Sequence, residues 1–358
     1  MTEPSPVLDG RARRVRRIVM TATVAAALPV AASLVAMGPA SAAMARPQVP
    51  GIPHTVPTNC VPDVGACGYP DAETSGVPGT VVLQEVPEQV SSGPGWTYKS
   101  AGYVQVNGNG ADLQGLLIPY DVVITGSNVT LKDDEITQGV VSGANIRGHI
   151  PATPAPDPSL NDAVTLRHTS GVTIEDTTIS GLIPDSTNLA GGIIDVYGDS
   201  TEVTIRSDNI ADTSLAVQVN AGMVEGNYVH SEMAGDDGGK IGGIESNSGS
   251  ELLTIEDNTV LVGSSNGYAI GLYSDYGTQG NKTIDGNLLA GGNYALYGGF
   301  NSGGPDTTNI VVNDNRFSRY FYGNGGLYGP VAHWDAAGSG NTWTGNFWDD
   351  ALAAIPEP

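Results

Sequence analysis

A short phrase that recurs along the second half of the chain constrains the fold more than any other feature. Three copies, each a β-branched run followed by two polar or small residues and an Asn, end at Asn258, Asn287 and Asn315. These asparagines lie 29 and 28 residues apart. A fixed period of about 20 to 50 residues is typical of stacked supersecondary units. The phrase therefore predicts a solenoid in which each copy contributes to one coil.

The period extends in both directions. Asn227 and Asn346 end two further copies, and the apolar strand continues upstream to about residue 127, where Asp208, Thr177 and Asp134 occupy the Asn position. The runs are β-branched and alternating, with no helical period, so each unit is predicted to be a strand and a turn. One copy cannot bury an apolar face alone, whereas stacked copies share a core. We predict an all-β fold: a right-handed parallel β-helix, a single-stranded solenoid, because parallel crossovers are right-handed by default.

The repeated Asn has two interpretations. In the first, each side-chain amide bonds the equivalent amide one coil away, forming a ladder of the kind that stabilises stacked strands. In the second, the Asn occupies a corner with the left-handed backbone conformation that this residue tolerates. Both interpretations favour coils of parallel strands.

The start of the chain has the pattern of an export signal. Arginines between residues 11 and 17 precede an apolar, Ala-rich run from Ile18 to Gly38, and Ala40-Ser41-Ala42 has the small side chains of a cleavage site. We therefore expect a secreted, extracellular protein with no membrane contact after cleavage. The expected segments are an export signal at 1–43, a Pro-rich lead-in at 44–59, the β-helix domain at 60–350 and a tail at 351–358.

The charge balance restricts the partners. With 38 acidic and 15 basic residues, the chain has a formal net charge of −23. Such a surface repels nucleic acid and anionic membranes, and it repels polyanionic sugars unless cations intervene. We expect a monomer that binds a polysaccharide and no nucleic acid. Scattered Asp and Gly residues could hold Ca²⁺, but the sequence has no EF-hand loop, and metal ligands stay unassigned.

The two cysteines, Cys60 and Cys67, are expected to form a disulfide, because exported proteins fold in an oxidising environment. Metal binding by two cysteines without a nearby His would be unusual. A solenoid needs polar or looped caps at both ends. The loop between the cysteines is our candidate for the N-terminal closure, and Trp343, Phe347 and Trp348 are the candidates for the C-terminal closure.

Several phrases are similar to a known group of proteins. They include Cys67-Gly68-Tyr69-Pro70, Ser127-Asn128-Val129-Thr130-Leu131 and Leu288-Leu289-Ala290-Gly291-Gly292. Over about residues 60–350 the chain resembles exported actinobacterial right-handed parallel β-helix proteins of the pectate-lyase-like superfamily. The resemblance implies an action on carbohydrates, because that superfamily is rich in polysaccharide lyases and glycoside hydrolases. A shared fold alone does not establish function.

A second strand precedes the Asn strand in each coil and predicts a ligand-binding face. Because successive side chains of a strand point to opposite faces, inward aliphatic residues leave their neighbours outward. Coils about 4.7–4.9 Å apart would then carry a polar and aromatic stripe suited to an extended sugar chain. The alternative is a solvated face whose aromatic residues pack against each other. The expected stripe comprises Asp195, Tyr197, Gln218, Asn220, Glu245, Tyr273, Tyr297 and His333.

An irregular segment, residues 228–243, leads into Glu245. Loops on a rigid scaffold are where catalytic residues collect, although acidic loops are also commonly just solvated. In proteins that the chain resembles, this place often reads His-x-Asp-Gly-Ile-Gln, whereas here Glu245 replaces the Gln and the His and Asp are absent. The candidates that the segment contributes are His230, Asp236, Asp237 and Lys240.

Two mechanisms fit these residues. A hydrolase needs one protonated and one ionised carboxyl, which Glu245 could form with Asp195 or with a loop aspartate. A lyase needs a base, for which Lys240 and then His230 are the candidates, and positive charge near the enolate, from Arg206, Arg316 or Ca²⁺. Arg316 is also expected to bind the substrate. We hypothesise a secreted carbohydrate-active enzyme, a polysaccharide lyase or a glycoside hydrolase. The alternative is a non-catalytic glycan-binding or cell-surface β-helix.

Overall fold

A computed structural model describes most of the chain beyond the predicted export signal. The described residues form an almost all-β protein with one short 3-10 helix, η1 (Val64–Cys67). Within this part of the chain, no helix is long and apolar enough to cross a membrane. The described residues are 58–137, 140–141, 144–145, 162–181, 191–231, 241–302, 304 and 306–358.

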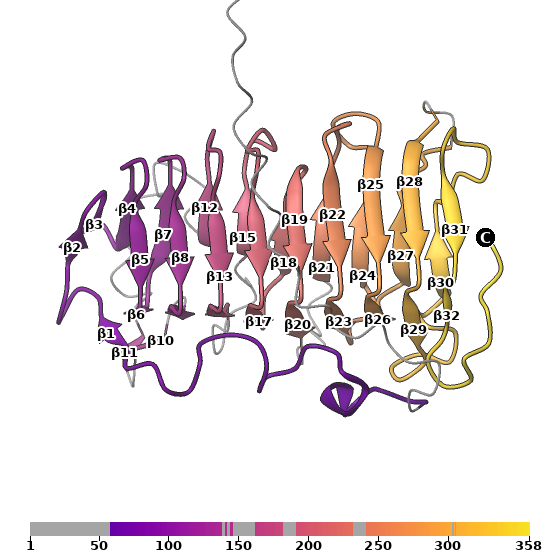
Figure 1. Cartoon of the computed structure of the whole chain (residues 1–358), viewed down its shortest axis with the longest axis horizontal. Coiled ribbons are helices and arrows are strands. Elements are labelled where there is room, and N and C mark those ends of the chain that lie inside the picture. Colours follow the sequence, from indigo (N-terminus) through magenta and orange to yellow (C-terminus); the bar gives the residue numbers. More distant parts are fainter. Residues whose placement is uncertain are drawn as a thin grey trace, which may run out of the picture. The chain divides into compact units, whose positions relative to one another are not determined.

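Three long sheets run side by side along the stacked coils (Figure 1). Nearly every strand pairs in parallel with the equivalent strand of the next coil, so the predicted parallel β-helix is confirmed. We call the three sheets A, B and C. A typical coil passes through sheet B, then sheet C, then sheet A, as β21, β22 and β23 do. A separate antiparallel pair is formed by β10 (Val140–Val141) and β11 (Ala144–Asn145).

Sheet C holds the repeated β-branched runs. Its central residues, such as Ile174, Ile205 and Val224, lie in register on successive coils and are fully buried. Their stacking forms one side of the core. The strands are β5 (Asp112–Gln114), β8 (Thr130–Lys132), β13 (Thr173–Glu175), β16 (Thr204–Arg206), β19 (Gly222–Glu225), β22 (Leu253–Glu256), β25 (Gly280–Asp285), β28 (Thr308–Asn313) and β31 (Thr342–Thr344).

Sheet A follows the Asn position of each coil. Its central residues, including Ile179, Ile210 and Val260, continue the buried core. The strands are β1 (Gln84–Glu85), β6 (Leu116–Ile118), β9 (Glu135–Thr137), β14 (Thr178–Ser180), β17 (Asn209–Ala211), β20 (Tyr228–Ser231), β23 (Thr259–Val262), β26 (Leu288–Gly291), β29 (Arg316–Ser318) and β32 (Phe347–Trp348).

Sheet B contains the second strand of each coil and carries the predicted stripe. Its buried column runs through Val217, Ile244, Ile270 and Leu296. The strands are β2 (Ser92–Gly93), β3 (Trp96–Lys99), β4 (Tyr103–Val106), β7 (Asp121–Ile124), β12 (Asp162–Leu166), β15 (Gly191–Asp195), β18 (Leu215–Gln218), β21 (Ile241–Ser246), β24 (Gly267–Leu272), β27 (Tyr294–Gly298) and β30 (Gly329–Ala332).

The asparagines form a buried ladder at the corner between sheets C and A. The side-chain amide of Asn227 donates to the side-chain oxygen of Asn258 at 2.9 Å, and Asn258 donates in the same way to Asn287 at 2.9 Å. The series continues to Asn315 at 2.9 Å and to Asn346 at 3.0 Å. The ladder interpretation is therefore confirmed, because equivalent asparagines stand in one column.

The residue before each Asn forms the corner. Asp257, Gly286 and Asp314 have left-handed φ angles of 55°, 68° and 52°. The second interpretation was therefore wrong about the position: a short polar residue or Gly makes the turn, and the following Asn points inward to bond its neighbours. This division of roles explains why a short polar residue or Gly directly precedes each Asn.

A segment that we call the strap, residues 58–85, runs along the outside of sheet A from the last coil to the first (Figure 1). At one end the Cys60 N–H donates to Asp349 of the last coil at 2.9 Å. Midway, the Gly76 N–H donates to the Ser207 carbonyl at 2.7 Å. At the other end Gln84 begins the parallel pairing of β1 with β6. The strap therefore connects coils from both ends of the solenoid.

The closure of the solenoid differs from the prediction at the N-terminal end and agrees with it at the C-terminal end. The Cys60–Cys67 disulfide is present, but its loop packs beside the last coils, so its predicted role as the N-terminal closure was wrong. The N-terminal end is instead closed by the antiparallel β2, β3 and β4, with Trp96 buried in the core. At the C-terminal end Trp343 and Trp348 pack against the core, as predicted.

Candidate functional site

The outward column of sheet B brings three predicted residues together. Register pairs Gln218 with Glu245, Glu245 with Gly271, and Gly271 with Tyr297. The residue before each of these in its strand is fully buried, so this column points away from the core. Gln218 and Tyr297 are half-buried, while Glu245 is 7% exposed. The predicted shared face for Gln218, Glu245 and Tyr297 is therefore confirmed.

Asp195 does not belong to this column. Ile194 is the residue that pairs with Gln218, and Asp195 pairs with the fully buried Leu166. The Asp195 carboxylate is fully buried and accepts hydrogen bonds from the backbone N–H and the hydroxyl of Ser200, at 3.0 and 2.9 Å. Burial raises the pKa of Asp195. Its predicted outward position was wrong.

The reason is a pair of adjacent isoleucines in β15. Ile193, which is fully buried, pairs with the core residue Val217, so Ile194 occupies the outward position. Starting the alternation from the wrong isoleucine moves every later side chain to the opposite face. As a consequence, Asp195 and Glu245 lie on opposite faces of sheet B and do not form the predicted carboxyl pair.

Six aromatic side chains form one connected group on the outer face of sheet B, which we call the aromatic cluster. Ring centroids of contacting members lie 5.2 to 6.0 Å apart. Such spacings are typical of favourable edge-to-face and tilted aromatic pairs. The cluster extends over three coils, those of β24, β27 and β30. Its members are Tyr268, Tyr273, Tyr294, Tyr297, Tyr328 and His333.

Glycine makes room for part of this cluster. A Cβ atom on Gly271 would lie 2.5 Å from the Tyr273 ring and 2.8 Å from the Tyr268 ring. The backbone at Gly271 is therefore the surface on which both rings pack. Gly242 has a similar role, because a Cβ there would lie 2.5 Å from the Tyr268 hydroxyl.

Sequence reasoning missed three members of the cluster, Tyr268, Tyr294 and Tyr328. A signal for the first two was present: the dipeptide Tyr-Ala recurs at the start of β24 and β27, at Tyr268 and Tyr294. Tyr328 lies just before β30 and is strongly exposed. No repeated phrase marks it, and only the fold brings it to Tyr294, at a centroid distance of 5.9 Å.

Glu245 stands at the border of the aromatic cluster. The Tyr268 hydroxyl donates a hydrogen bond to its carboxylate. Burial raises the pKa of Tyr273, and the nearby Tyr297, Glu245 and Asp275 raise it further. Tyr273 therefore keeps its hydroxyl proton at all ordinary pH values. The site thus offers phenol hydroxyls and one carboxylate beside apolar ring faces.

Other predicted residues lie in the turns that follow the strands of sheet B. Tyr197 is 58% exposed and stacks on His168. His333 is exposed, and its ring centroid lies 5.5 Å from that of Tyr297, which makes it a member of the aromatic cluster. Asn220, by contrast, is nearly buried, and its side chain bonds the Asn247 N–H at 2.9 Å and the Gly198 carbonyl at 3.1 Å. Asn220 therefore holds turns together, which corrects its predicted place on the open stripe.

His230 lies on another sheet from Glu245. It belongs to β20 of sheet A, where its ring stacks on Tyr228 at 4.3 Å and its Nε2 lies 3.0 Å from the Asn209 side-chain oxygen. The described structure therefore does not group His230 with Glu245. Lys240, Asp236 and Asp237, the other candidates of that segment, lie outside the described residues.

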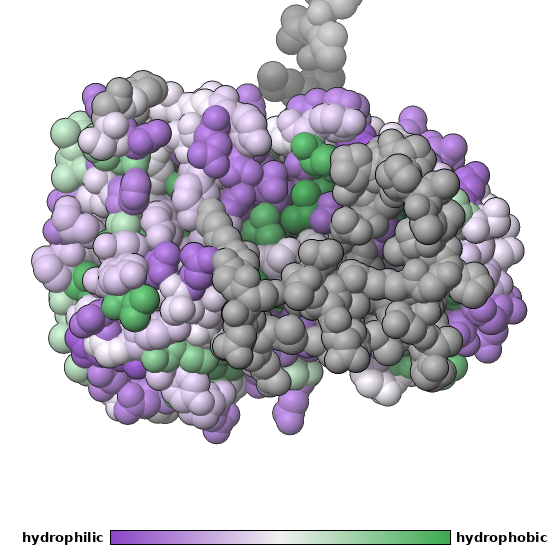
Figure 2. Space-filling view, turned by 180° about the vertical axis from the view of Figure 1, so that it is seen from behind, coloured by the Kyte–Doolittle hydropathy of each residue, from purple (hydrophilic) through white to green (hydrophobic). Residues whose placement is uncertain are grey.

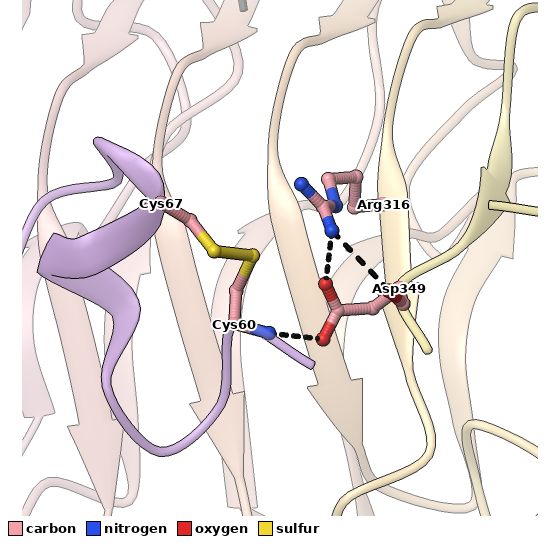
Figure 3. Close-up of a disulfide and its surroundings, with 4 residues drawn as sticks. All are labelled: Cys60, Cys67, Arg316 and Asp349. Atoms are coloured by element: carbon pink, nitrogen blue, oxygen red, sulfur yellow. Dashed lines mark hydrogen bonds and ion pairs between the residues drawn. A yellow bond between two sulfur atoms is a disulfide. The ribbon is translucent and has the colours of Figure 1, made fainter. Parts of the chain in front are cut away.

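Arg316 is part of the interior between sheet A and the strap, which corrects its predicted role in binding substrate. Its side chain is 1% exposed, and its guanidinium lies 2.6 Å from the Asp349 carboxylate (Figure 3). The other oxygen of that carboxylate accepts the Cys60 N–H at 2.9 Å. The Arg316 guanidinium also lies 5.9 Å from the centroid of the Tyr69 ring in the strap. Arg316 therefore fixes the strap to the last coils.

Metal ligands are not assembled among the described residues. Over these parts of the chain, no group of three or more His, Cys, Asp or Glu side chains could hold a metal ion. On the side of the molecule seen in Figure 2, the visible surface is mostly hydrophilic, with apolar residues in small groups.

No protein-family model, curated protein or solved structure matches this chain.

Proposed function

We propose that this protein binds an extended glycan along the outer face of sheet B. The observation that carries the proposal is the continuous series of ring contacts from Tyr273 to Tyr328 over three coils. Tyr side chains combine an apolar face with a hydroxyl, and sugar rings present apolar faces edged by hydroxyls. A row of such rings along the axis matches the shape of a polysaccharide better than that of a compact ligand.

The preferred glycan carries no negative charge. The formal net charge of −23 produces a field that repels polyuronates, and Glu245 places a carboxylate beside the rings. An uncharged chain avoids this repulsion. A polyuronate would need a bridging cation such as Ca²⁺, which can be tested directly by adding and chelating Ca²⁺ in the binding assay.

The sequence supports both an extracellular location and a carbohydrate ligand. The pattern of residues 1–43 favours export, and the resemblance to pectate-lyase-like proteins favours a carbohydrate ligand. We propose an extracellular protein from which this segment is removed. Mass determination of the protein recovered from culture medium tests the cleavage.

Cleavage of the bound glycan is the second candidate. The carboxylate of Glu245, almost buried beside the aromatic cluster, is the observation that favours it. A glycosidase needs a second carboxyl, and Asp195 is on the opposite face. The other predicted partners of Glu245, Asp236 and Asp237, lie outside the described residues.

The test is a binding panel with the full exported protein. Fragments of cellulose, xylan, mannan, galactan and polygalacturonate are titrated, and product formation is followed as new reducing ends and as ultraviolet absorbance of unsaturated uronate. Tyr297→Ala should weaken binding by about tenfold, equivalent to ~1.4 kcal/mol. Tyr276→Ala is the matched control, because Tyr276 is 84% exposed and lies outside the aromatic cluster. Equal effects of both variants, or no binding of any glycan, would reject the proposal.

A further inference from the structure

A second pair of rings lies near the middle of sheet B, beside β12 and β15. The imidazole of His168 and the phenol of Tyr197 stack almost in parallel, with centroids 4.2 Å apart and planes inclined by 7°. The Asp199 carboxylate lies 2.6 Å from His168 Nδ1 and fixes the orientation of the imidazole. Both rings are largely exposed. An oriented, exposed ring pair is a preformed stacking surface.

This pair lies on the same edge of the sheet as the aromatic cluster. His168 and Tyr197 follow the ends of β12 and β15, while Tyr273 and His333 follow the ends of β24 and β30. In sheet B, β15 and β24 are separated by β18 and β21. At about 4.8 Å for each of the three steps, the two ring surfaces are about 14 Å apart along the axis.

The intervening edge carries no rings at the equivalent positions. Asn220 and Asn247 follow β18 and β21, and both are nearly buried. Asn247 donates its N–H to the Asn220 side chain at 2.9 Å, which joins the turns that follow β18 and β21. The outward column beside it offers Gln218 and Glu245. A ligand bridging the two ring surfaces would therefore cross a polar stretch.

We propose that the His168–Tyr197 pair is a second subsite for the same glycan chain whose other end stacks on the aromatic cluster. This inference rests on the proposed glycan binding. The alignment of the two ring surfaces on one side of sheet B and the formal net charge of −23, which repels anionic ligands, argue for one uncharged, extended occupant. Two subsites joined by one ligand add affinity only when the ligand is long enough to reach both.

A chain-length series provides the test. Oligosaccharides of two to eight sugars are prepared from whichever neutral polymer of the panel binds best, and their affinities are measured with the full protein. Affinity should rise when the oligosaccharide first fills the aromatic cluster and rise again, by about tenfold, when it reaches Tyr197. Tyr197→Ala should remove the second rise and leave short oligosaccharides unaffected, whereas Tyr297→Ala should weaken every length.

Two further variants test whether the second rise in affinity depends on the oriented ring pair. Asp199→Asn should reduce the second rise by a smaller factor, because it loosens the orientation of the imidazole without removing a ring. Tyr276→Ala should change neither stage. If Tyr197→Ala retains the second rise, or if the wild-type series shows one stage only, the second subsite is rejected while glycan binding stands. If no oligosaccharide binds the wild-type protein, the proposed function is rejected as well.

Discussion

The outer faces of sheets A and B are made by the same coils but have different neighbours. On sheet A, the strap covers Arg316, and the guanidinium is buried against Asp349. On sheet B, Tyr297 and His333 lie at the surface among other rings. A charged or aromatic residue that points out of a coil is therefore structural where the strap passes, and it is a candidate for binding where no other described segment covers it.

Removing Arg316 should give the largest effect and should act on stability alone. Arg316→Met leaves the buried carboxylate of Asp349 without its charge partner, and breaking a buried pair in this way costs about 3–5 kcal/mol. The measurement is urea-induced unfolding. Glycan affinity of the folded variant should be unchanged, because sheet B is not altered.

Arg319 is the matched control for this comparison. It pairs with Asp350 at 2.9 Å, but both side chains are about one-third exposed. Solvent screening limits such pairs to about 1 kcal/mol or less. Similar losses from Arg316→Met and Arg319→Met would contradict the idea that the strap interior is held by the buried pair.

The ladder corner beside sheet A predicts a pH dependence of stability. Burial raises the pKa of Asp134 from 3.8 to about 7, and its carboxyl accepts the Leu116 N–H at 2.8 Å. Because the folded-state pKa is above the unfolded value, this contribution to stability is complete below about pH 4. It is lost as pH rises toward 7, by up to about 4 kcal/mol.

Asp134→Asn should reduce this pH dependence, because Asn is the residue that the ladder uses elsewhere and does not ionise. Asp208, which is buried in the same column with a raised pKa, should account for the dependence that is left. Unfolding free energies measured between pH 4 and pH 8 provide the check. Asp314→Asn is the control, because Asp314 occupies an equivalent corner position, before Asn315, and its side chain is exposed. A wild-type stability that stays flat over this range would show that Asp134 does not ionise in it.

Gly271→Ala should reduce stability less than Arg316→Met does, and it should also reduce glycan binding. The new methyl group would lie 2.5 Å from the Tyr273 ring and 2.8 Å from the Tyr268 ring, so both rings must shift. We expect a stability loss of about 1–2 kcal/mol from overpacking and a severalfold loss of glycan affinity. Calorimetric titration with the best neutral glycan measures the latter.

Gly79→Ala, in the strap, is the corresponding control, because a Cβ at Gly79 would meet nothing within 4 Å. It should leave both stability and affinity close to those of the wild-type protein. Were Gly271→Ala to leave glycan affinity intact, the rings over Gly271 would be structural, like the residues beneath the strap.

Prediction from sequence succeeded where the same residue recurs at the same position of successive coils. Asn258 and Asn287 could be placed in a column because each coil returns the same phrase to the same corner. It failed at Asp195, because two adjacent isoleucines, Ile193 and Ile194, are equally apolar and only the pairing with Val217 decides which one faces the core. Alternation gives two solutions there, and local composition does not choose between them.

The sequence by itself determined that this protein is a stack of parallel coils with an Asn at one recurring position, because a periodic fold repeats its local interactions at every turn. The structure decided that these asparagines form a ladder. Only the tertiary structure decided which outward residues are covered. The strap begins at the last coil and ends at the first, so its contacts join residues as distant as Cys60 and Asp349. No repeated feature of the sequence predicts such a contact. The stacking of β27 on β30 brings Tyr328, which no repeated phrase marks, to Tyr294 and thereby extends the surface that we propose for the glycan.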